Sequence, residues 1–247
     1  MRLTVLGCAG TFPSAESGCS AYLVEHDGFR LLLDAGNGAI GALQRHVGLF
    51  DLDAVLLSHL HADHCLDLVA YSYARRYHPE RPARLVVHGP RGTAERLVQV
   101  FDKAPEDGLH DVYDFRTTSP GTTRIGPFEV TLTPTAHPVE CYAIRVAAGG
   151  RSLTYSADTG PSLDVARAAA GTDLFLCEST WLEDSPRPPN LHLTAREAGE
   201  HAARADVGRL ALIHTTAYLD QDAYVEQAAQ AFAGPIERAH PGATYDL

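Results

Sequence analysis

One short stretch constrains this chain more than any other: Ser58-His59-Leu60-His61-Ala62-Asp63-His64. It places four potential metal ligands within six consecutive positions, directly after an apolar run at 53–57 that predicts a buried strand. Imidazole and carboxylate groups are ligands that a divalent ion such as zinc accepts. A polar turn satisfied by caps and water is the simpler alternative, but three histidines and an aspartate at this spacing favour a metal site.

The geometry of this turn favours two neighbouring ions over one. Alternation along the backbone directs His59 and His61 to one side, whereas Asp63 and His64 bend back toward another point. A pair of ions lowers the pKa of a shared water molecule and stabilises both oxygens of an in-line displacement. The stretch therefore predicts a metal-dependent hydrolase, and on its own it does not identify the substrate.

Composition limits the classes of protein and of partner. With 247 residues, 45% of them hydrophobic, the chain can bury a sizeable core, and no linker divides it, so we expect a single domain over residues 1–247. Acidic residues outnumber basic ones by 31 to 20, which disfavours long nucleic acids as ligands. Five scattered cysteines indicate reduced thiols, and no signal segment or membrane-spanning run is visible. We therefore expect a soluble, cytoplasmic protein.

Hydrophobic periodicity and turn residues predict alternating strands and helices. The expected strands occupy 2–6, 22–25, 29–34, 53–57, 85–88, 112–116, 128–132, 141–146, 152–156, 173–178 and 209–214, with a tail strand within 236–245. The expected helices occupy 37–47, 66–77, 93–101, 194–205 and 220–232, and a further helix follows Asp158. Thr194 and Glu197 have the spacing of a capping box. Strands in two groups with flanking helices predict an αββα sandwich, in which two sheets lie face to face with helices outside.

The pattern His-x-His-x-Asp-His at 59–64 resembles that of the metallo-β-lactamase-fold hydrolases, and the chain is similar to that superfamily from end to end. The resemblance implies the four-layer αββα metallo-β-lactamase fold, of mixed α/β (α+β) class. It also implies two divalent ions, zinc first and manganese as the alternative. The implied ligands are His59, His61 and His137 for the first ion, Asp63, His64 and His214 for the second, and Asp158 as the bridge between them.

Asp34 belongs to the segment Asp34-Ala35-Gly36, which closes an expected hairpin. The resemblance places this segment beneath the metal site, where Asp34 would support the ligand loop without binding metal. The alternative is that Asp34 caps the helix expected over 37–47. The sequence leaves both interpretations open.

A leaving alkoxide needs a proton, and two residues outside the metal set are candidates to provide it. Glu178 at the tip of an expected strand and His192 before an expected helix resemble the Glu/His pair of the ribonuclease Z branch. The resemblance implies that His192 touches the phosphate or the leaving oxygen, while Glu178 orients its other ring nitrogen. Together with Asp63, they form the expected catalytic set. The alternative is that His192 merely precedes a helix.

Three features favour a small phosphodiester over tRNA as the substrate. Ribonuclease Z enzymes carry a long arm that grips tRNA, inserted between the third His and the bridging Asp, whereas here the interval from His137 to Asp158 holds only two expected strands and Gly149-Gly150. The family's Pro-x-Lys-Arg-Asn segment is absent, and the chain is acidic.

The chain also resembles the ribonuclease Z-like actinobacterial proteins described as atypical cyclic-AMP phosphodiesterases, on the segments 41–46, 58–68, 75–79 and 191–193. The resemblance implies that a hydroxide bridging the two ions attacks phosphorus. We therefore expect hydrolysis of a small phosphodiester, with a 3′,5′-cyclic nucleotide such as cyclic AMP first among the candidates.

Several further side chains are candidates for substrate contact. Arg76, Tyr77 and His78 lie at the end of an expected helix and could grip a phosphate or stack on a base. Trp181 and Tyr218 could also stack on a base. Each of these side chains could equally be a solvated or a packing residue.

Other partners and functions follow from the same resemblances. The ribonuclease Z resemblance suggests a homodimer, and we expect neither a membrane nor tRNA as a partner. The alternative functions are a ribonuclease Z-like tRNA 3′-processing endonuclease and another metal-dependent hydrolase of the lactamase or thioesterase type. A non-catalytic sensor of a ligand is a further alternative, which would predict fewer than two bound ions or an occluded site.

Overall fold

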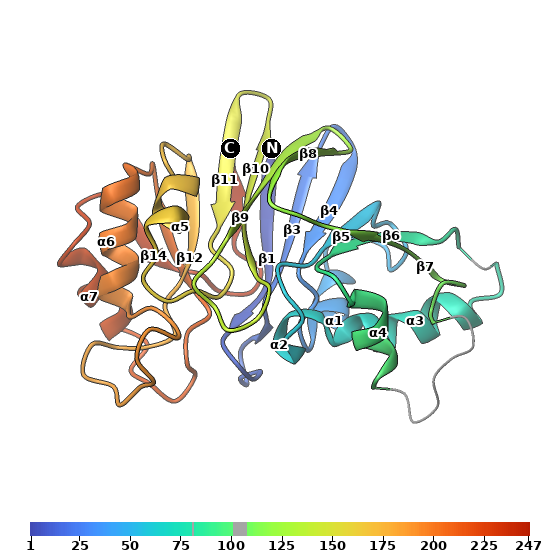
Figure 1. Ribbon diagram of the computed structural model, residues 1–247, viewed down its shortest axis with the longest axis horizontal. Helices are drawn as coiled ribbons and strands as arrows, with labels where there is room; N and C mark the ends of the chain where they lie inside the picture. Colours follow the sequence, from blue (N-terminus) through green and yellow to red (C-terminus); the bar gives the residue numbers. More distant parts are fainter. Residues whose placement is uncertain (81, 101–107) are drawn as a thin grey trace.

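Two β-sheets lie face to face in the centre of the structure, and helices cover the outer face of each (Figure 1). The computed structural model describes residues 1–80, 82–100 and 108–247. The αββα sandwich expected from the sequence is therefore confirmed. No helix in these described ranges is long and apolar enough to cross a membrane.

The first sheet comes from the N-terminal part of the chain and from its last strand. Its strand order is β15-β1-β3-β4-β5-β6-β7, with β2 paired to β1. The strands are β1 (Arg2–Ala9), β2 (Gly18–Cys19), β3 (Ala21–His26), β4 (Phe29–Leu33), β5 (Ala54–Leu56), β6 (Leu85–Gly89), β7 (Tyr113–Thr117) and β15 (Thr244–Asp246). From β4 to β7 the strands are parallel. Parallel neighbours need crossover connections, which here contain α1 (Ala39–Leu43), α2 (Ala62–Cys65), α3 (Asp67–Tyr77) and α4 (Thr93–Val98).

The second sheet follows in the chain and has the strand order β14-β13-β12-β11-β10-β9-β8. Its strands are β8 (Gly121–Ile125), β9 (Phe128–Pro134), β10 (Tyr142–Ala148), β11 (Arg151–Tyr155), β12 (Leu174–Glu178), β13 (Leu210–Ile213) and β14 (Ile236–Arg238). The strands β8 to β11 form an antiparallel meander, whereas β11 to β14 are parallel. The parallel part is connected through α5 (Leu163–Ala168), α6 (Ala195–Ala205) and α7 (Ala223–Ala229).

The central strands are apolar on both faces, because each face meets a different layer. In β12, Leu174 and Leu176 belong to the core between the two sheets. The alternate residues Phe175 and Cys177 belong to the core beneath α6 and α7. This arrangement explains why the sequence shows continuous apolar runs in these strands, since a strand with one solvent-exposed face would alternate apolar with polar residues.

The C-terminal tail differs from the expectation of a single added strand. It supplies two strands, because β14 pairs with β13 in the second sheet and β15 then pairs with β1 in the first. Backbone hydrogen bonds of 2.8 and 3.0 Å join Met1 to Leu247, so the two ends of the chain lie together (Figure 1). The helix expected over 93–101 ends at Val98, and Phe101 lies outside the described residues.

The capping box expected at the start of α6 is confirmed. The Thr194 side chain accepts a hydrogen bond from the Glu197 backbone N–H at 3.1 Å, and the Glu197 carboxylate accepts one from the Thr194 N–H at 2.8 Å. These bonds satisfy donors that the first turn of a helix leaves without partners. They fix the point at which the chain enters α6, two residues after His192.

We predict that Thr194→Ala lowers the free energy of unfolding by about 1 kcal/mol, because the N-cap hydroxyl is lost. Denaturation by urea, followed by circular dichroism, measures the change. Thr194→Ser is the matched control, since it keeps the hydroxyl and should retain most of the stability. Equal losses in the two variants would contradict the role of the cap.

Candidate metal centre

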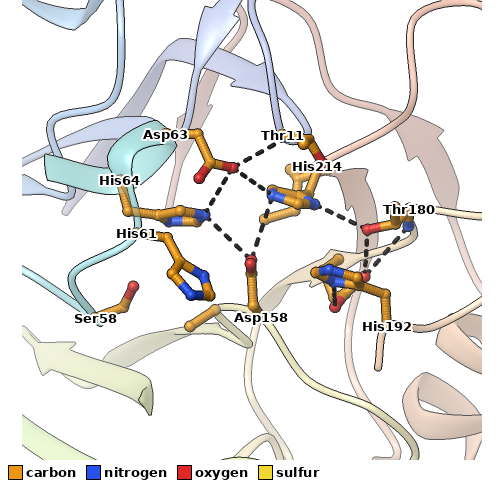
Figure 2. Close-up of polar contacts among 12 residues, drawn as sticks. Thr11, Ser58, His61, Asp63, His64, Asp158, Thr180, His192 and His214 are labelled. Carbon is orange, nitrogen blue, oxygen red and sulfur yellow. Dashed lines mark hydrogen bonds and ion pairs between the residues drawn. The ribbon is translucent and has the colours of Figure 1, made fainter. Parts of the chain in front are cut away.

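The residues assigned to metal binding come from distant parts of the chain and lie together at one edge of both sheets (Figure 2). They follow strand ends, where a rigid scaffold places short loops side by side. β5 leads into the turn at 59–64, and β9, β11 and β13 each deliver one further residue. The members are His59, His61, Asp63, His64, His137, Asp158 and His214.

The first group of donor atoms comprises His59 Nε2, His61 Nδ1, His137 Nε2 and Asp158 Oδ2. His61 Nδ1 lies 3.1 Å from His59 Nε2 and 3.2 Å from His137 Nε2. Asp158 Oδ2 lies 3.5 Å from His59 Nε2 and 4.0 Å from His137 Nε2. Ligands at ~2.0–2.1 Å from a tetrahedral zinc ion are about 3.3 Å apart. The four atoms therefore have the spacing of one coordination shell.

The second group shares Asp158 with the first. Its donors are Asp63 Oδ2, His64 Nε2, His214 Nε2 and Asp158 Oδ1. Asp158 Oδ1 is 3.2 Å from His64 Nε2 and 3.4 Å from His214 Nε2, and Asp63 Oδ2 is 3.2 Å from His214 Nε2. The two oxygens of one carboxylate thus face two different sets of candidate ligands.

Besides the second ring nitrogen of His137, Nδ1, two buried atoms of the cluster lack a hydrogen-bond partner in the described structure: His64 Nε2 and Asp158 Oδ1. An unsatisfied buried polar group costs about 1–3 kcal/mol, and such atoms are uncommon in folded proteins. They lie 3.2 Å apart and point into the same group of donors. A divalent cation would satisfy both, so the residues present fit a metal ion.

Asp34 is fully buried and orients two of the imidazoles. Its Oδ2 accepts hydrogen bonds of 2.7 Å from His64 Nδ1, from the Ser58 hydroxyl and from the Tyr155 hydroxyl. Since His64 donates through Nδ1, its Nε2 presents a lone pair to the cluster. The Ser58 oxygen in turn lies 3.0 Å from His59 Nδ1, so Ser58 can accept that N–H while donating to Asp34. Asp34 thereby fixes the tautomers of His59 and His64.

These contacts decide between the two interpretations of Asp34. The N-cap residue of α1 is Gly38, and the side chain that accepts a hydrogen bond from the first turn of this helix is Asp67, from the Ile40 N–H at 2.9 Å. Capping by Asp34 is therefore wrong, and the carboxylate supports the ligand loop as the resemblance implied.

A second buried carboxylate, Glu178, orients two further imidazoles, those of His192 and His214. One oxygen lies 2.8 Å from His192 Nδ1, and the other accepts the Thr180 hydroxyl at 2.8 Å. The Thr180 oxygen also lies 2.9 Å from His214 Nδ1 (Figure 2). Because the Thr180 proton goes to Glu178, its oxygen can accept the Nδ1–H of His214, which leaves His214 Nε2 to the cluster.

At His59, His61, His137 and Asp158 the electrostatic environment favours the protonation state that binds a metal, whereas at His64 the carboxylates of Asp158 and Asp34 outweigh burial and raise the pKa of the imidazole. Burial lowers the pKa values of His59 and His61, and it lowers that of His137 to about 4. Burial would raise the pKa of Asp158, but the nearby imidazoles, His214 first among them, outweigh it and hold this pKa well below its usual value. Neutral imidazoles and ionised carboxylates are the forms that coordinate metal ions.

Three residues other than glycine adopt left-handed backbone angles where strands enter the centre. The φ angles are 56° at Asp34, 52° at Ala157 and 56° at His214. Such angles cost free energy for residues that carry a Cβ atom, so the surrounding contacts must hold them. Ala157 directly precedes Asp158, and Asp34 and His214 themselves belong to the site. Thr11, which contacts Asp63, has a φ of 65°, so four of the eight non-glycine residues with positive φ in the described structure lie at the centre.

His192 lies at the rim of the cluster, with its side chain 11% exposed. Its ring centroid is 5.4 Å from that of His214 and 5.6 Å from that of His137. Burial opposes its protonation, but Glu178 outweighs burial and raises the pKa of His192 to about 9. With Nδ1 held by Glu178, one ring nitrogen remains for a further partner.

A family model described as a beta-lactamase superfamily domain matches residues 29–215. The chain belongs to this superfamily. An uncharacterized protein of Mycobacterium leprae is 40% identical over 253 residues, which cover 100% of this chain and 89% of that protein. The fold and the metal-dependent hydrolase class expected from the sequence are therefore confirmed.

Two further relatives agree with that assignment. The probable metallo-hydrolase YhfI of Bacillus subtilis is 29% identical over 249 residues and 100% of both chains. Its crystal structure, of a metallo-β-lactamase fold protein, matches with a TM-score of 0.88 and 28% identity, over 99% of this chain and 98% of that chain. The ribonuclease Z of Haloferax volcanii is 28% identical over 300 residues, which cover 98% of this chain and 93% of that protein.

The structure places Arg76, Tyr77 and His78 at the far end of α3. This helix of 11 residues leads away from the metal turn toward β6 and β7, so its last residue lies about 15 Å along the helix axis from its first (Figure 1). Arg76 forms an ion pair of 2.5 Å with Asp111, and the His78 ring packs against Phe50 at 4.7 Å between centroids. The fold does not bring these three residues together with the cluster.

Trp181 is closer to the centre, because it directly follows Thr180 and pairs with Thr194 in an isolated β-bridge. Its indole Nε1 is buried without a hydrogen-bond partner in the described structure.

Three residues at the site were not predicted from the sequence. Tyr155 donates to Asp34, Thr180 contacts His214, and the backbone N–H of Thr11 donates to Asp63 Oδ2 at 3.0 Å. Thr180 could have been suspected from its place just after Glu178, but no motif marks the other two.

We predict that Asp34→Asn lowers metal affinity by ~10–100-fold, the usual scale for a residue that orients metal ligands. Both Asp34 oxygens accept hydrogen bonds, so an amide NH₂ in place of either one faces donors. Competition with a chromogenic chelator measures the affinity, and circular dichroism verifies folding. Tyr155→Phe is the matched control, because it removes one of these bonds and should have a much smaller effect. Unchanged affinity in Asp34→Asn would refute the orienting role.

Proposed function

We propose that this protein is a phosphodiesterase that uses two divalent metal ions to hydrolyse a small phosphodiester, with a 3′,5′-cyclic nucleotide such as cyclic AMP as its substrate. The observation that carries the proposal is the Glu178–His192 pair beside the metal cluster. His192 Nδ1 lies 2.8 Å from a Glu178 carboxylate oxygen. The centroid of the His192 ring lies within 5.6 Å of the ring centroids of the candidate ligands His137 and His214. Hydrolysis of a phosphodiester requires such a proton donor beside the metals.

The chain's own residues would hold the ions as two sets that share Asp158. When bound, a pair of divalent ions supplies Lewis acidity toward a phosphoryl group and an activated water molecule. Zinc suits these imidazole-rich sets, with manganese as the alternative. Asp63 completes one set, and its side chain is 13% exposed. It can therefore accept a hydrogen bond from an incoming water molecule and orient it.

His192 supplies the proton that the reaction needs. During hydrolysis the oxygen of water bonds to phosphorus, one ester P–O bond breaks, and the departing alkoxide takes up a proton. Glu178 holds His192 Nδ1, and Glu178 is itself held by the Thr180 hydroxyl and by backbone N–H groups. The other ring nitrogen can then donate to the leaving oxygen, a contribution of about 10²–10⁴-fold in rate for general acid catalysis.

The size of the substrate is inferred from what surrounds the centre. The chain between His137 and Asp158 forms the β10–β11 hairpin, which turns at Gly149 and Gly150. No extended arm projects from this part of the described structure. The formal net charge of −11 also opposes binding of a long polyanion. Both observations support a small substrate.

Maturation of tRNA 3′ ends is the second candidate function. It is favoured by the similarity over most of the chain to the ribonuclease Z of Haloferax volcanii. The same Glu178–His192 pair would serve that reaction, because a phosphodiester bond is broken in both. The two candidates therefore differ in the substrate that is bound and not in the chemistry.

A direct assay separates these functions. The metal-loaded protein is incubated with cyclic AMP, with bis(p-nitrophenyl) phosphate and with a precursor tRNA, and products are quantified. We expect turnover of cyclic AMP and of the chromogenic diester. Turnover of neither diester, with both ions present by elemental analysis, would refute the proposal. Faster maturation of the tRNA than hydrolysis of cyclic AMP would favour the second candidate.

We predict that His192→Ala lowers kcat by ~10²-fold or more while metal content stays unchanged, because the general acid is lost and the ligands are kept. The exposed His46 provides a control, and His46→Ala should match the unmodified protein in both measurements. Loss of bound metal in His192→Ala would instead make His192 a ligand, since Glu178, His192 and His214 themselves form a group of potential donors.

A further inference from the structure

The described part of the chain exposes four aromatic side chains, and they form two stacked pairs. Phe12 is 42% exposed and Tyr218 is 69% exposed, with ring centroids 6.2 Å apart and planes inclined by 14°. Tyr73 and Tyr77 are 46% and 72% exposed, with centroids 6.0 Å apart. The second pair lies one turn apart on α3. The first joins two loops that are distant in sequence, so tertiary structure brings it together.

Phe12 and Tyr218 lie on loops that also carry residues at the metal centre. Phe12 directly follows Thr11, whose backbone N–H donates to Asp63 Oδ2 at 3.0 Å. Tyr218 lies four residues after the candidate ligand His214, in a turn closed by a backbone hydrogen bond of 3.1 Å. Figure 2 shows Thr11 next to Asp63 and His214. Tyr218 therefore belongs to the loop that carries the candidate ligand His214. Phe12 belongs to the loop that contacts the candidate ligand Asp63.

Backbone contacts fix these two loops against each other. Ala9 and Thr215 form a β-bridge, and the Gly10 N–H donates to the Thr215 carbonyl at 3.1 Å. A Cβ atom at Gly10 would lie 2.5 Å from the His214 carbonyl oxygen and 2.8 Å from His214 Nδ1, so only glycine allows this approach. The two loops that carry the aromatic pair are consequently fixed relative to His214 and to each other.

We propose that Phe12 and Tyr218 bind the base of the substrate nucleotide by stacking. This inference rests on the proposed function, since a single ribose separates the base from phosphorus in a cyclic nucleotide. A phosphate at the metal centre therefore places the base beside the cluster. Every nucleobase has a flat π face, and stacking on aromatic side chains tolerates any base. The pair thus selects nucleotides over phosphodiesters without a base, and it does not select among bases.

Binding of a product-like ligand tests the pair without turnover. The metal-loaded protein is titrated calorimetrically with adenosine 5′-monophosphate and with ribose 5-phosphate, which lacks the base. We expect Phe12→Ala/Tyr218→Ala to weaken binding of the nucleotide about 10-fold or more, the scale of a lost stacking contact. Binding of ribose 5-phosphate should not change. Tyr218→Phe, which keeps the ring, should bind the nucleotide like the unmodified protein.

Matched variants and a kinetic measurement distinguish base stacking from a general loss of structure. Tyr73→Ala/Tyr77→Ala removes the comparable pair on α3 and should leave nucleotide affinity unchanged. The single variant Tyr218→Ala should fold normally, because this side chain is 69% exposed. Its affinity for the nucleotide therefore tests the pair without a loss of structure. In the kinetic arm, the Phe12→Ala/Tyr218→Ala protein should show a raised KM for cyclic AMP and a constant kcat.

The outcomes separate this inference from the proposed function. Equal affinity of the unmodified protein for the two ligands would overturn the inference, as would unchanged nucleotide affinity in Phe12→Ala/Tyr218→Ala. A loss of dimer in that variant together with unchanged nucleotide affinity would also overturn it, because the pair would then be an interface between copies of the chain. Nucleotide binding that depends on the pair, without hydrolysis of cyclic AMP, would sustain the inference and refute the phosphodiesterase.

Discussion

Two buried carboxylates determine the geometry of the metal centre. Asp34 and Glu178 each orient two imidazoles, one directly and one through a hydroxyl group, that of Ser58 or that of Thr180. A buried carboxylate is costly unless hydrogen bonds compensate it. Each of these two accepts at least four. The imidazoles therefore stabilise the carboxylates that aim them, and neither part forms without the other.

The two sheets have to pack correctly before this network can form. Asp34 follows β4 in the first sheet, whereas Tyr155, which donates to it, ends β11 in the second. The ligands are divided in the same way, since the turn at 59–64 follows β5 and the other three ligands follow strands of the second sheet. The core between the sheets is thus a structural requirement of the site. A substitution that shifts one sheet against the other would separate donors that lie 3.2 to 4.0 Å apart.

A site residue could be predicted from the sequence when the residues that reveal its role are adjacent to it in the chain. The turn at 59–64 carries four ligands in one segment, so its chemistry was visible directly. His137, Asp158 and His214 are isolated residues, and only the resemblance to a family assigned them. Tyr155 could not be assigned, because its role exists only after strands from separate parts of the chain meet; the position of Thr180 after Glu178 is visible in the sequence, but its contact with His214 is not. The edge strand β8 was missed for the opposite reason, since four of its five residues are exposed and show no apolar pattern.

The two flanks of the centre differ in chemistry, and that difference bears on the orientation of a substrate. Figure 2 shows Thr11 and His192 on opposite sides of His214. His192 can donate a proton on one side, whereas the loop of Thr11 also carries Phe12, whose ring stacks on that of Tyr218. A nucleotide bound with its base on the aromatic flank would direct its leaving oxygen toward His192. Under the proposed function, the reverse orientation would place the base against His192 and leave the alkoxide without a donor, so the arrangement of the two flanks would favour one direction of cleavage.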